Sequence, residues 1–192
     1  MNVLFSLLLL LAPVKLEHGQ FTILKDGKKI GTEDFSIAQR SGGYLVEGKT
    51  TIGDRTVSSR MELDAKLSVT SYQVSAAEGS IVVKVASPVS ELQTVVKGET
   101  STADFRFPDG GVILDNDFFH HYLILMYRVQ TGQNSFSVFV PSDMRNGTAT
   151  VRRTGAGTYD LDVGDVRLQA TTDANGTLTK LIVTSANVVV QR

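Results

Sequence analysis

The stretch LDNDFFHHYLILMYRV, residues 114–129, is the one long internal run whose pattern predicts a helix, while the rest of the chain reads as strands and turns. At about 100° per residue, most of its apolar side chains share one broad face. The side chains that fall opposite are His120, His121, Ile124 and Arg128. Asp115 and Asp117 supply a cap and a negative first turn, and Gly132 follows as a stop. The stretch therefore predicts a long amphipathic helix over about residues 115–130.

Outside this stretch, apolar and polar residues alternate between turn dipeptides, which is typical of an antiparallel meander. The Asp26-Gly27 dipeptide between two alternating runs predicts a tight hairpin. In residues 55–63, buried-type and polar side chains alternate strictly, so one face of that strand should contact water. The turn spacing predicts about 11–12 strands. We expect a mainly β fold, an antiparallel meander curled into an open or closed barrel or roll, with the helix packed on or in it.

Length and composition indicate one domain, because 192 residues contain no charge run or linker that would divide them. The 19 basic and 20 acidic residues give a formal net charge of −1, so no basic field attracts nucleic acid. The absence of cysteine excludes disulfides, thiol nucleophiles and thiolate metal sites. We expect a monomer that does not bind nucleic acid.

The first 18 residues are similar to a signal peptide. The unbroken run from Leu7 to Leu11 has the length of a signal-peptide core and is too short to span a bilayer. The signal is atypical, because no Lys or Arg precedes the run and Ala12-Pro13-Val14 is a poor cleavage site. A buried first strand or helix is the alternative. We therefore expect a periplasmic or secreted protein whose single β domain covers residues 19–192.

The sequence carries no motif of an enzyme. It has no nucleophile-elbow motif and no phosphate-binding glycine loop. His120 and His121, with Asp115 and Asp117 upstream, form the one cluster of possible metal ligands. Neighbouring side chains on a helix diverge by about 100°, and a zinc site needs at least three protein ligands. We expect both histidines at the surface or edge of the helix, with no catalytic residue, no metal and no cofactor.

Three stretches carry a resemblance to known proteins: residues 20–31, 64–72 and 172–181. The first resembles the opening strands of an uncharacterised group of bacterial secreted β-proteins. The other two resemble later strands of that group and of lipoprotein carriers of the LolA/LolB kind. The resemblance implies an open or incomplete barrel whose concave face holds an acyl chain beneath a helix, and it implies no catalytic residue. Those carriers have several short lid helices, whereas here one long helix carries all the lid surface.

The aromatic and methionine face of the expected helix has two interpretations. Apolar stripes at helical spacing usually complete a solid core. Alternatively, the helix and the concave sheet enclose a cavity for an acyl chain, because such cavities are mostly apolar and Met adapts to irregular shapes. Residues 108–111 and 130–133 are then candidate hinges. The candidate ligand-binding residues are Phe118, Phe119, Tyr122, Leu123 and Met126.

We expect an exported, non-catalytic protein that binds or carries an apolar ligand, a lipid or an acyl chain, between the curved sheet and the helix. The alternative is a structural or adaptor module of the cell envelope with a solid core and a protein partner. A carrier should contain a void and co-purify with a lipid, whereas an adaptor should have a filled core and co-purify with a protein.

Overall fold

The computed structural model describes residues 16–192. Within that range it contains 15 strands, one α-helix and two 3-10 helices. The helix α1 covers His121–Gln130, and η1 and η2 cover Pro141–Asp143 and Thr184–Ala186. The strands in chain order are β1 (Glu17–Lys25), β2 (Lys28–Arg40), β3 (Gly43–Ile52), β4 (Arg55–Asp64), β5 (Val69–Ala76), β6 (Gly79–Lys84), β7 (Ser90–Val96), β8 (Glu99–Phe105), β9 (Val112–Ile113), β10 (Ser135–Val140), β11 (Arg145–Gly155), β12 (Thr158–Val163), β13 (Val166–Thr172), β14 (Leu178–Val183) and β15 (Val188–Gln191).

All 15 strands form one sheet, in the order β8-β7-β6-β5-β4-β3-β2-β1-β15-β14-β13-β12-β11-β10-β9. Consecutive strands pair antiparallel within two arms, β1–β8 and β10–β15. The arms are joined where β1 pairs with β15, and β9 pairs parallel with β10. Because β8 and β9 lie at opposite ends of the order and do not pair, the sheet is not closed.

The expected mainly β antiparallel meander is confirmed. The expected number of about 11–12 strands is too low: η2 divides the predicted last strand into β14 and β15, and the two-residue β9 is too short to show alternation. The Asp26-Gly27 hairpin is confirmed, with both residues at positive φ and Lys25 paired with Lys28. On β4, buried and exposed residues alternate as expected.

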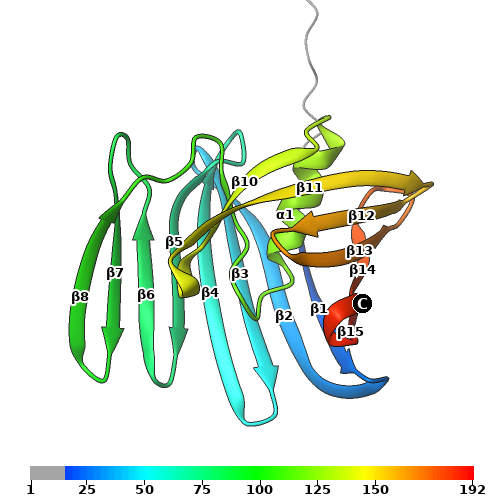
Figure 1. The fold of residues 1–192 in the computed structure, drawn as a ribbon, viewed down its shortest axis with the longest axis horizontal. Coiled ribbons are helices and arrows are strands. Elements are labelled where there is room, and N and C mark those ends of the chain that lie inside the picture. The colour runs from blue at the N-terminus through cyan, green and yellow to red at the C-terminus, as the bar shows by residue number, and fades with distance from the viewer. Residues whose placement is uncertain (1–15) are drawn as a thin grey trace, which may run out of the picture.

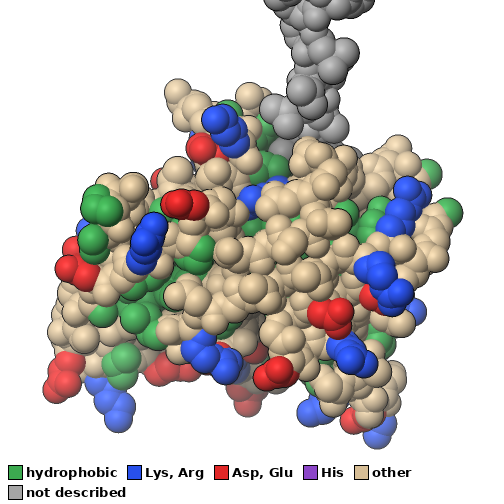
Figure 2. Space-filling model, turned by 45° about the horizontal axis from the view of Figure 1, so that its top comes forward, with side chains coloured by type: hydrophobic (Ala, Val, Ile, Leu, Met, Phe, Trp, Pro, Cys, Tyr) green, Lys and Arg blue, Asp and Glu red, His purple; other side chains and the backbone are tan. Residues whose placement is uncertain are grey.

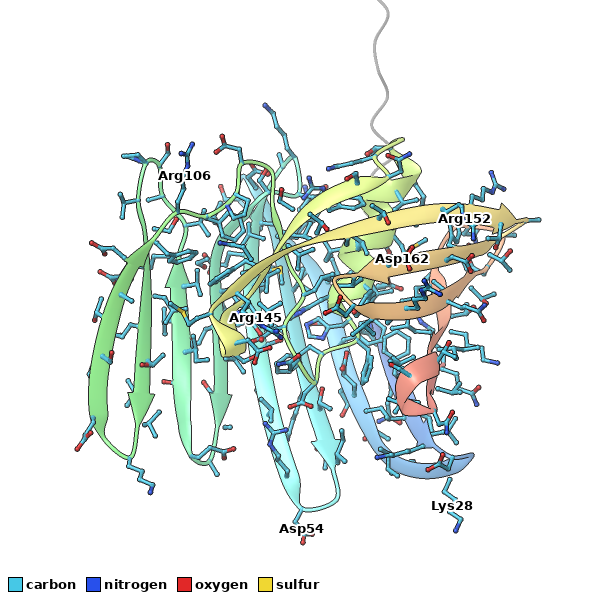
Figure 3. All side chains as sticks on the ribbon, viewed as in Figure 1. Lys28, Asp54, Arg106, Arg145, Arg152 and Asp162 are labelled. Carbon is cyan, nitrogen blue, oxygen red and sulfur yellow. The ribbon has the colours of Figure 1, made fainter. Side chains whose placement is uncertain are left out.

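The sheet folds over so that β10–β14 lie across β1–β5, and α1 lies between these two parts (Figure 1). Apolar side chains from both arms and from α1 form one core, which includes Phe21, Met61, Leu125, Phe139 and Leu161. Charged side chains such as Lys28, Asp54 and Arg152 point outward (Figure 3). The β6–β8 end of the sheet extends beyond the covering strands.

The long amphipathic helix expected over residues 115–130 is wrong in length and in pattern. The structure has a ten-residue α1 that starts at His121, because Asp117 adopts a positive φ of 67° and the carboxylates of Asp115 and Asp117 bond to other elements. Ile124 and Arg128, expected to face water, are only 4% and 8% exposed. A helix enclosed by two parts of a sheet is buried on nearly all sides, so it needs no polar face.

Arg128 fixes both segments that the sequence suggested as hinges. Its guanidinium donates to Gly110 O at 2.8 Å and to Gln133 Oε1 at 2.9 and 3.1 Å. It also lies 5.4 Å from the centroid of the Phe136 ring. Desolvation by burial lowers the pKa of Arg128, but a guanidinium keeps its proton at neutral pH. The turn before β9 and the turn after α1 are therefore tied to one side chain.

The expected signal peptide falls mainly on residues 1–15, which lie outside the described residues. The sheet begins at Glu17, so His18, which we placed before the domain, belongs to β1. Within residues 16–192, no helix has the length and apolar character needed to cross a membrane.

The helix core supplies a first prediction. Met126 is 1% exposed, so Met126→Trp should overpack the space between helix and sheet and lower the free energy of unfolding by about 1–3 kcal/mol. Met126→Leu, which nearly conserves volume, should cost less than about 1.5 kcal/mol. Urea unfolding of both variants measures the difference. A fully stable Met126→Trp protein would reveal a void beneath the helix and contradict the packed core.

Candidate ligand-binding site

Three neighbouring strands carry polar residues on their core-facing side. Glu33 on β2 shares that side with Phe35 and is fully buried. Thr50 on β3 is its register partner and is 2% exposed. Ser59 on β4 pairs with Gly48 of β3 and is 5% exposed. These residues form a polar patch on an otherwise apolar face, which is unusual because buried polar groups need partners.

The Glu33 carboxylate binds the segment that leads into α1. Its Oε1 accepts the backbone N–H of His120 at 2.6 Å and faces His120 Nδ1 at 2.9 Å, while Oε2 accepts the N–H of Phe119 at 2.8 Å. The Thr50 hydroxyl lies 2.9 Å from Oε2 and 2.8 Å from Asp117 O, so its one proton serves either acceptor. Glu33 therefore acts as a cap supplied by a distant strand, with a negative charge at the positive end of the helix.

His120 joins Glu33 to Ser59. With Nδ1 on the carboxylate, its Nε2 lies 3.1 Å from Ser59 Oγ. This serine–histidine–carboxylate order is the order found in hydrolases that use a serine nucleophile. Here Ser59 lies in neither cavity described below. A methyl group on Gly48 would come within 2.1 Å of the His120 ring, so the ring rests directly on the strand backbone. The arrangement anchors the helix to the sheet.

Asp115 organises a second buried cluster beside the first. Its Oδ2 accepts the Tyr72 hydroxyl at 2.9 Å. Its Oδ1 accepts the backbone N–H groups of Asn116 and Ser142 at 3.0 and 3.1 Å, and also the Ser142 hydroxyl. The carboxylate is 5% exposed and has no Lys or Arg partner among residues 16–192. The carboxylate is therefore stabilised only by neutral hydrogen-bond donors, and no nearby cation of the described residues offsets its negative charge.

His121 completes the second cluster. Its Nδ1 accepts the backbone N–H of Asp115 at 3.2 Å, whereas its buried Nε2 has no partner within the described range. Burial, and then the neighbouring His120, lower the pKa of His121 well below its ordinary value. The ring is therefore neutral at pH 7, with the proton on Nε2.

The expected surface positions of His120 and His121 are wrong. We expected surface or helix-edge positions and diverging rings, but His120 and His121 are 0% and 1% exposed and their ring centroids are 4.5 Å apart. The expectation failed because only His121 is in the helix: His120 is the residue before it, so the 100° rule does not apply. Among residues 16–192, no group of three or more His, Asp or Glu side chains could hold a metal ion.

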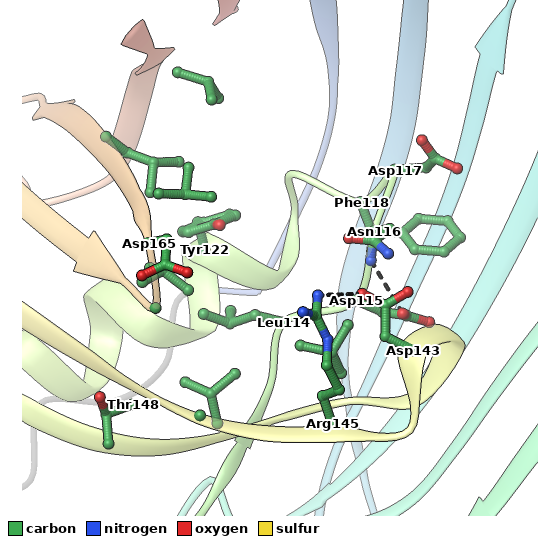
Figure 4. Close-up of a pocket in the computed structure, with 18 of the residues that line it drawn as sticks. Leu114, Asp115, Asn116, Asp117, Phe118, Tyr122, Asp143, Arg145, Thr148 and Asp165 are labelled. Carbon is green, nitrogen blue, oxygen red and sulfur yellow. Dashed lines mark hydrogen bonds and ion pairs between the residues drawn. The ribbon is translucent and has the colours of Figure 1, made fainter. Parts of the chain in front are cut away.

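A cavity of about 460 Å³ lies between β10–β14 and the segment that leads into α1 (Figure 4). We name it the Tyr122 cavity. Its size is in the range typical of small-molecule sites. Its apolar walls come from strands, from the segment and from α1: Leu114, Phe118, Phe119, Tyr122, Val138, Val140, Val163, Val166, Leu168 and Val183. The lining also contains charged and polar groups: Asp115, Asn116, Asp117, Asp143, Arg145, Asn146, Thr148 and Asp165.

A second, more open groove of about 450 Å³ lies on the other side of the same segment. We name it the Arg55 groove. Its floor is apolar and comes from β4–β7: Val57, Val74, Ala76, Ile81 and Val96. Arg55 at its rim pairs with Asp117 and Glu78. Val96 is 55% exposed, and Figure 2 shows hydrophobic side chains at the surface of this uncovered end of the sheet.

The structure divides the five candidate ligand-binding residues into two groups. Phe118, Phe119 and Tyr122 line the Tyr122 cavity, and Phe118 also lines the Arg55 groove. Leu123 and Met126 are 1% exposed and belong to the packed core. Ligand binding by these residues stays a prediction.

Sequence reasoning missed Glu33, Thr50 and Ser59 as partners of the segment that leads into the helix. It named Asp115 as a helix cap and a possible metal ligand, and not as a partner of Tyr72. One signal was present: Glu33 falls on the same side of its strand as Phe35 and Ile37, and Ser59 on the same side as Val57 and Met61. A polar residue at a core-facing position indicates a buried partner, but the alternation does not say which distant segment supplies that partner.

The Glu33 contacts give a second prediction. Glu33→Gln replaces an acceptor of both backbone N–H groups with an amide that has one acceptor oxygen, so the free energy of unfolding should fall by roughly 3 kcal/mol. Glu47→Gln on β3 is the matched control: its exposed pair with Arg60 should be worth at most about 1 kcal/mol. Equal effects in denaturant unfolding would show that Glu33 is not the anchor.

The neutral His121 gives a third prediction. Because its pKa is lower in the folded protein than in the unfolded chain, the unfolded chain binds more protons as pH falls below about 6.5. The stabilisation present above that pH is lost on acidification, by on the order of 1 kcal/mol between pH 7.5 and 5.5. His121→Asn keeps an acceptor for the Asp115 N–H and removes the titrating imidazole. Between the same two pH values, the unfolding free energy of this variant should therefore change less than that of the wild type, by the same amount. Identical pH profiles would contradict this assignment.

The chain matches no protein-family model, no curated protein and no solved structure. The resemblance to secreted β-proteins and lipoprotein carriers therefore stays a prediction. The Tyr122 cavity, the Arg55 groove and the segment between them are the features of the fold that suggest a function.

Proposed function

We propose that this chain is an exported, non-catalytic protein that binds an apolar small molecule, such as a lipid or an acyl chain, in the Tyr122 cavity. The observation that carries the proposal is a cavity of about 460 Å³ whose lining combines aromatic and aliphatic side chains with carboxylate and amide groups, beside a packed core. A cavity of this size would hold most of a small ligand or part of a long chain. Export rests on the leucine-rich start of the sequence.

The way the cavity is built supports the same proposal. Its wall segment is held at Glu33, at Asp115 and, through the turns around α1, at Arg128. Binding to a preformed site costs less conformational entropy than binding that must order a loop. Because Arg128 bonds to both turns around α1, these turns do not favour a lid motion of the helix. In this proposal the ligand enters at the exposed end of the cavity, near Thr148 and Asp165.

A fluorescence assay with the neutral probe N-phenyl-1-naphthylamine tests the proposal. We expect saturable uptake at one site per chain. Val166→Trp should weaken uptake at least 10-fold, because Val166 is 39% exposed, lines the cavity and shares its side of β13 with Leu168, which also lines it. An indole there would occupy the cavity. Arg167→Trp is the control: Arg167 is the next residue of β13, exposed, on the opposite side of the strand and outside the cavity lining, so this variant should bind like the wild type.

Two outcomes of this assay would contradict the proposal. The first is no uptake by a folded wild-type protein. The second is equal loss in Val166→Trp and Arg167→Trp, which would place the probe elsewhere.

The second candidate is an adaptor module with a protein partner. The free edge of β8 favours it: β8 pairs only with β7, and most of its residues are exposed. Unpaired edge strands can accept a strand from another chain. A protein that takes up no neutral probe and co-purifies with an envelope protein at a fixed ratio would support this candidate and reject ligand carriage.

A further inference from the structure

The charged groups in the lining of the Tyr122 cavity are mostly negative. They are four carboxylates, Asp115, Asp117, Asp143 and Asp165, and one guanidinium, Arg145. Arg145 is already paired with Asp143 at 2.7 Å, and this contact holds the pKa of Asp143 below its usual value. The Arg145 side chain is also 74% exposed, so water screens it. Among residues 16–192, the lining therefore contains no free cation to receive an anionic ligand.

Two of the carboxylates have no cationic partner among residues 16–192. Asp115 is buried and bonded only by neutral donors. Asp165 is exposed in the turn between β12 and β13 and has neither a hydrogen bond nor an ion pair. In Figure 4, Asp165 and Arg145 lie well apart in the pocket. Asp165 is thus a free anion at the opening of an apolar cavity.

The aromatic lining suits the same kind of ligand. Phe118, Phe119 and Tyr122 all line the cavity, and aromatic faces attract cations, most strongly where water is excluded. The Tyr122 hydroxyl has no hydrogen-bond partner within the described residues, and burial raises the pKa of Tyr122 to about 12. The phenol is therefore neutral at pH 7 and adds no charge to the cavity.

We infer that the ligand of the Tyr122 cavity carries a positive charge on its apolar body, as an alkylammonium compound does, with its cationic end beside Asp165. This inference rests on the proposed function and narrows it, because the sequence alone suggested a lipid or an acyl chain of unspecified charge. A fatty acid would place its carboxylate among Asp115, Asp165 and the Asp143–Arg145 pair, where it meets repulsion and no free donor cation. A neutral amphiphile would bind with intermediate affinity.

Three ligands with the same chain length test the inference: decyltrimethylammonium, 1-decanol and decanoate. Each would displace N-phenyl-1-naphthylamine from the full-length protein at pH 7.5 and low salt, below its micelle concentration. We expect the ammonium compound to bind about 10-fold more tightly than decanoate, with decanol between them. This preference should shrink at 0.5 M salt, because exposed charges are screened.

Asp165→Asn should weaken binding of the ammonium compound about 3- to 5-fold and leave decanol unchanged, as expected for an exposed charge pair. Asp162→Asn is the matched control: Asp162 is an exposed carboxylate of the same hairpin, 3.6 Å from Arg167 and outside the cavity lining, so neither ligand should change.

The outcomes separate the two proposals. Equal binding of all three ligands, or tightest binding of decanoate, would overturn the inference about charge while leaving ligand carriage intact. A response of decanol to Asp165→Asn as large as that of the ammonium compound would also overturn it. If the protein binds neither the probe nor any of the three ligands, ligand carriage itself fails.

Discussion

The contact on which the rest of the structure depends is the bond between a buried carboxylate and the start of the helix. Glu33 projects from β2 into the core and accepts the N–H groups of Phe119 and His120, which precede α1. A short helix has few internal hydrogen bonds, so its position comes from tertiary contacts. A buried carboxylate without donors would be strongly unfavourable, and N–H groups without an acceptor would be unfavourable as well. The carboxylate and the N–H groups therefore compensate one another, and their bonds fix the helix in one position on the sheet.

His120 and His121 extend this constraint in two directions. His120 links Glu33 to Ser59 on β4, and His121 accepts from the backbone of Asp115, which in turn binds Tyr72 on β5. The segment before the helix is thereby bonded to four adjacent strands, β2 to β5. A segment held at this many points keeps its shape whether or not a ligand is present. Its two sides become walls of the Tyr122 cavity and the Arg55 groove.

The serine, histidine and glutamate of this network are spaced as in a catalytic triad. Their separations of 3.1 and 2.9 Å fall within hydrogen-bonding range, as in a catalytic triad. Catalysis also needs a substrate beside the nucleophile and donors for a developing oxyanion. Ser59 is 5% exposed and lies in the lining of neither the Tyr122 cavity nor the Arg55 groove. The contacts of the three residues hold the start of α1 against the sheet.

The sequence by itself determined the antiparallel meander, because alternation and turn dipeptides are local signals. Asp26-Gly27 and the alternating residues of β4 needed no distant information. Tertiary structure alone decided the length of the helix and the burial of its histidines. The local signals of residues 115–120 favour a helix start, but the acceptors and donors that override them, Glu33, Tyr72 and Arg55, are 43 to 87 positions away in the chain. Local periodicity carries no information about partners this distant in the chain. The sequence therefore indicated three residues that line the cavity, Phe118, Phe119 and Tyr122, and the fold decided the shape and charge of that cavity.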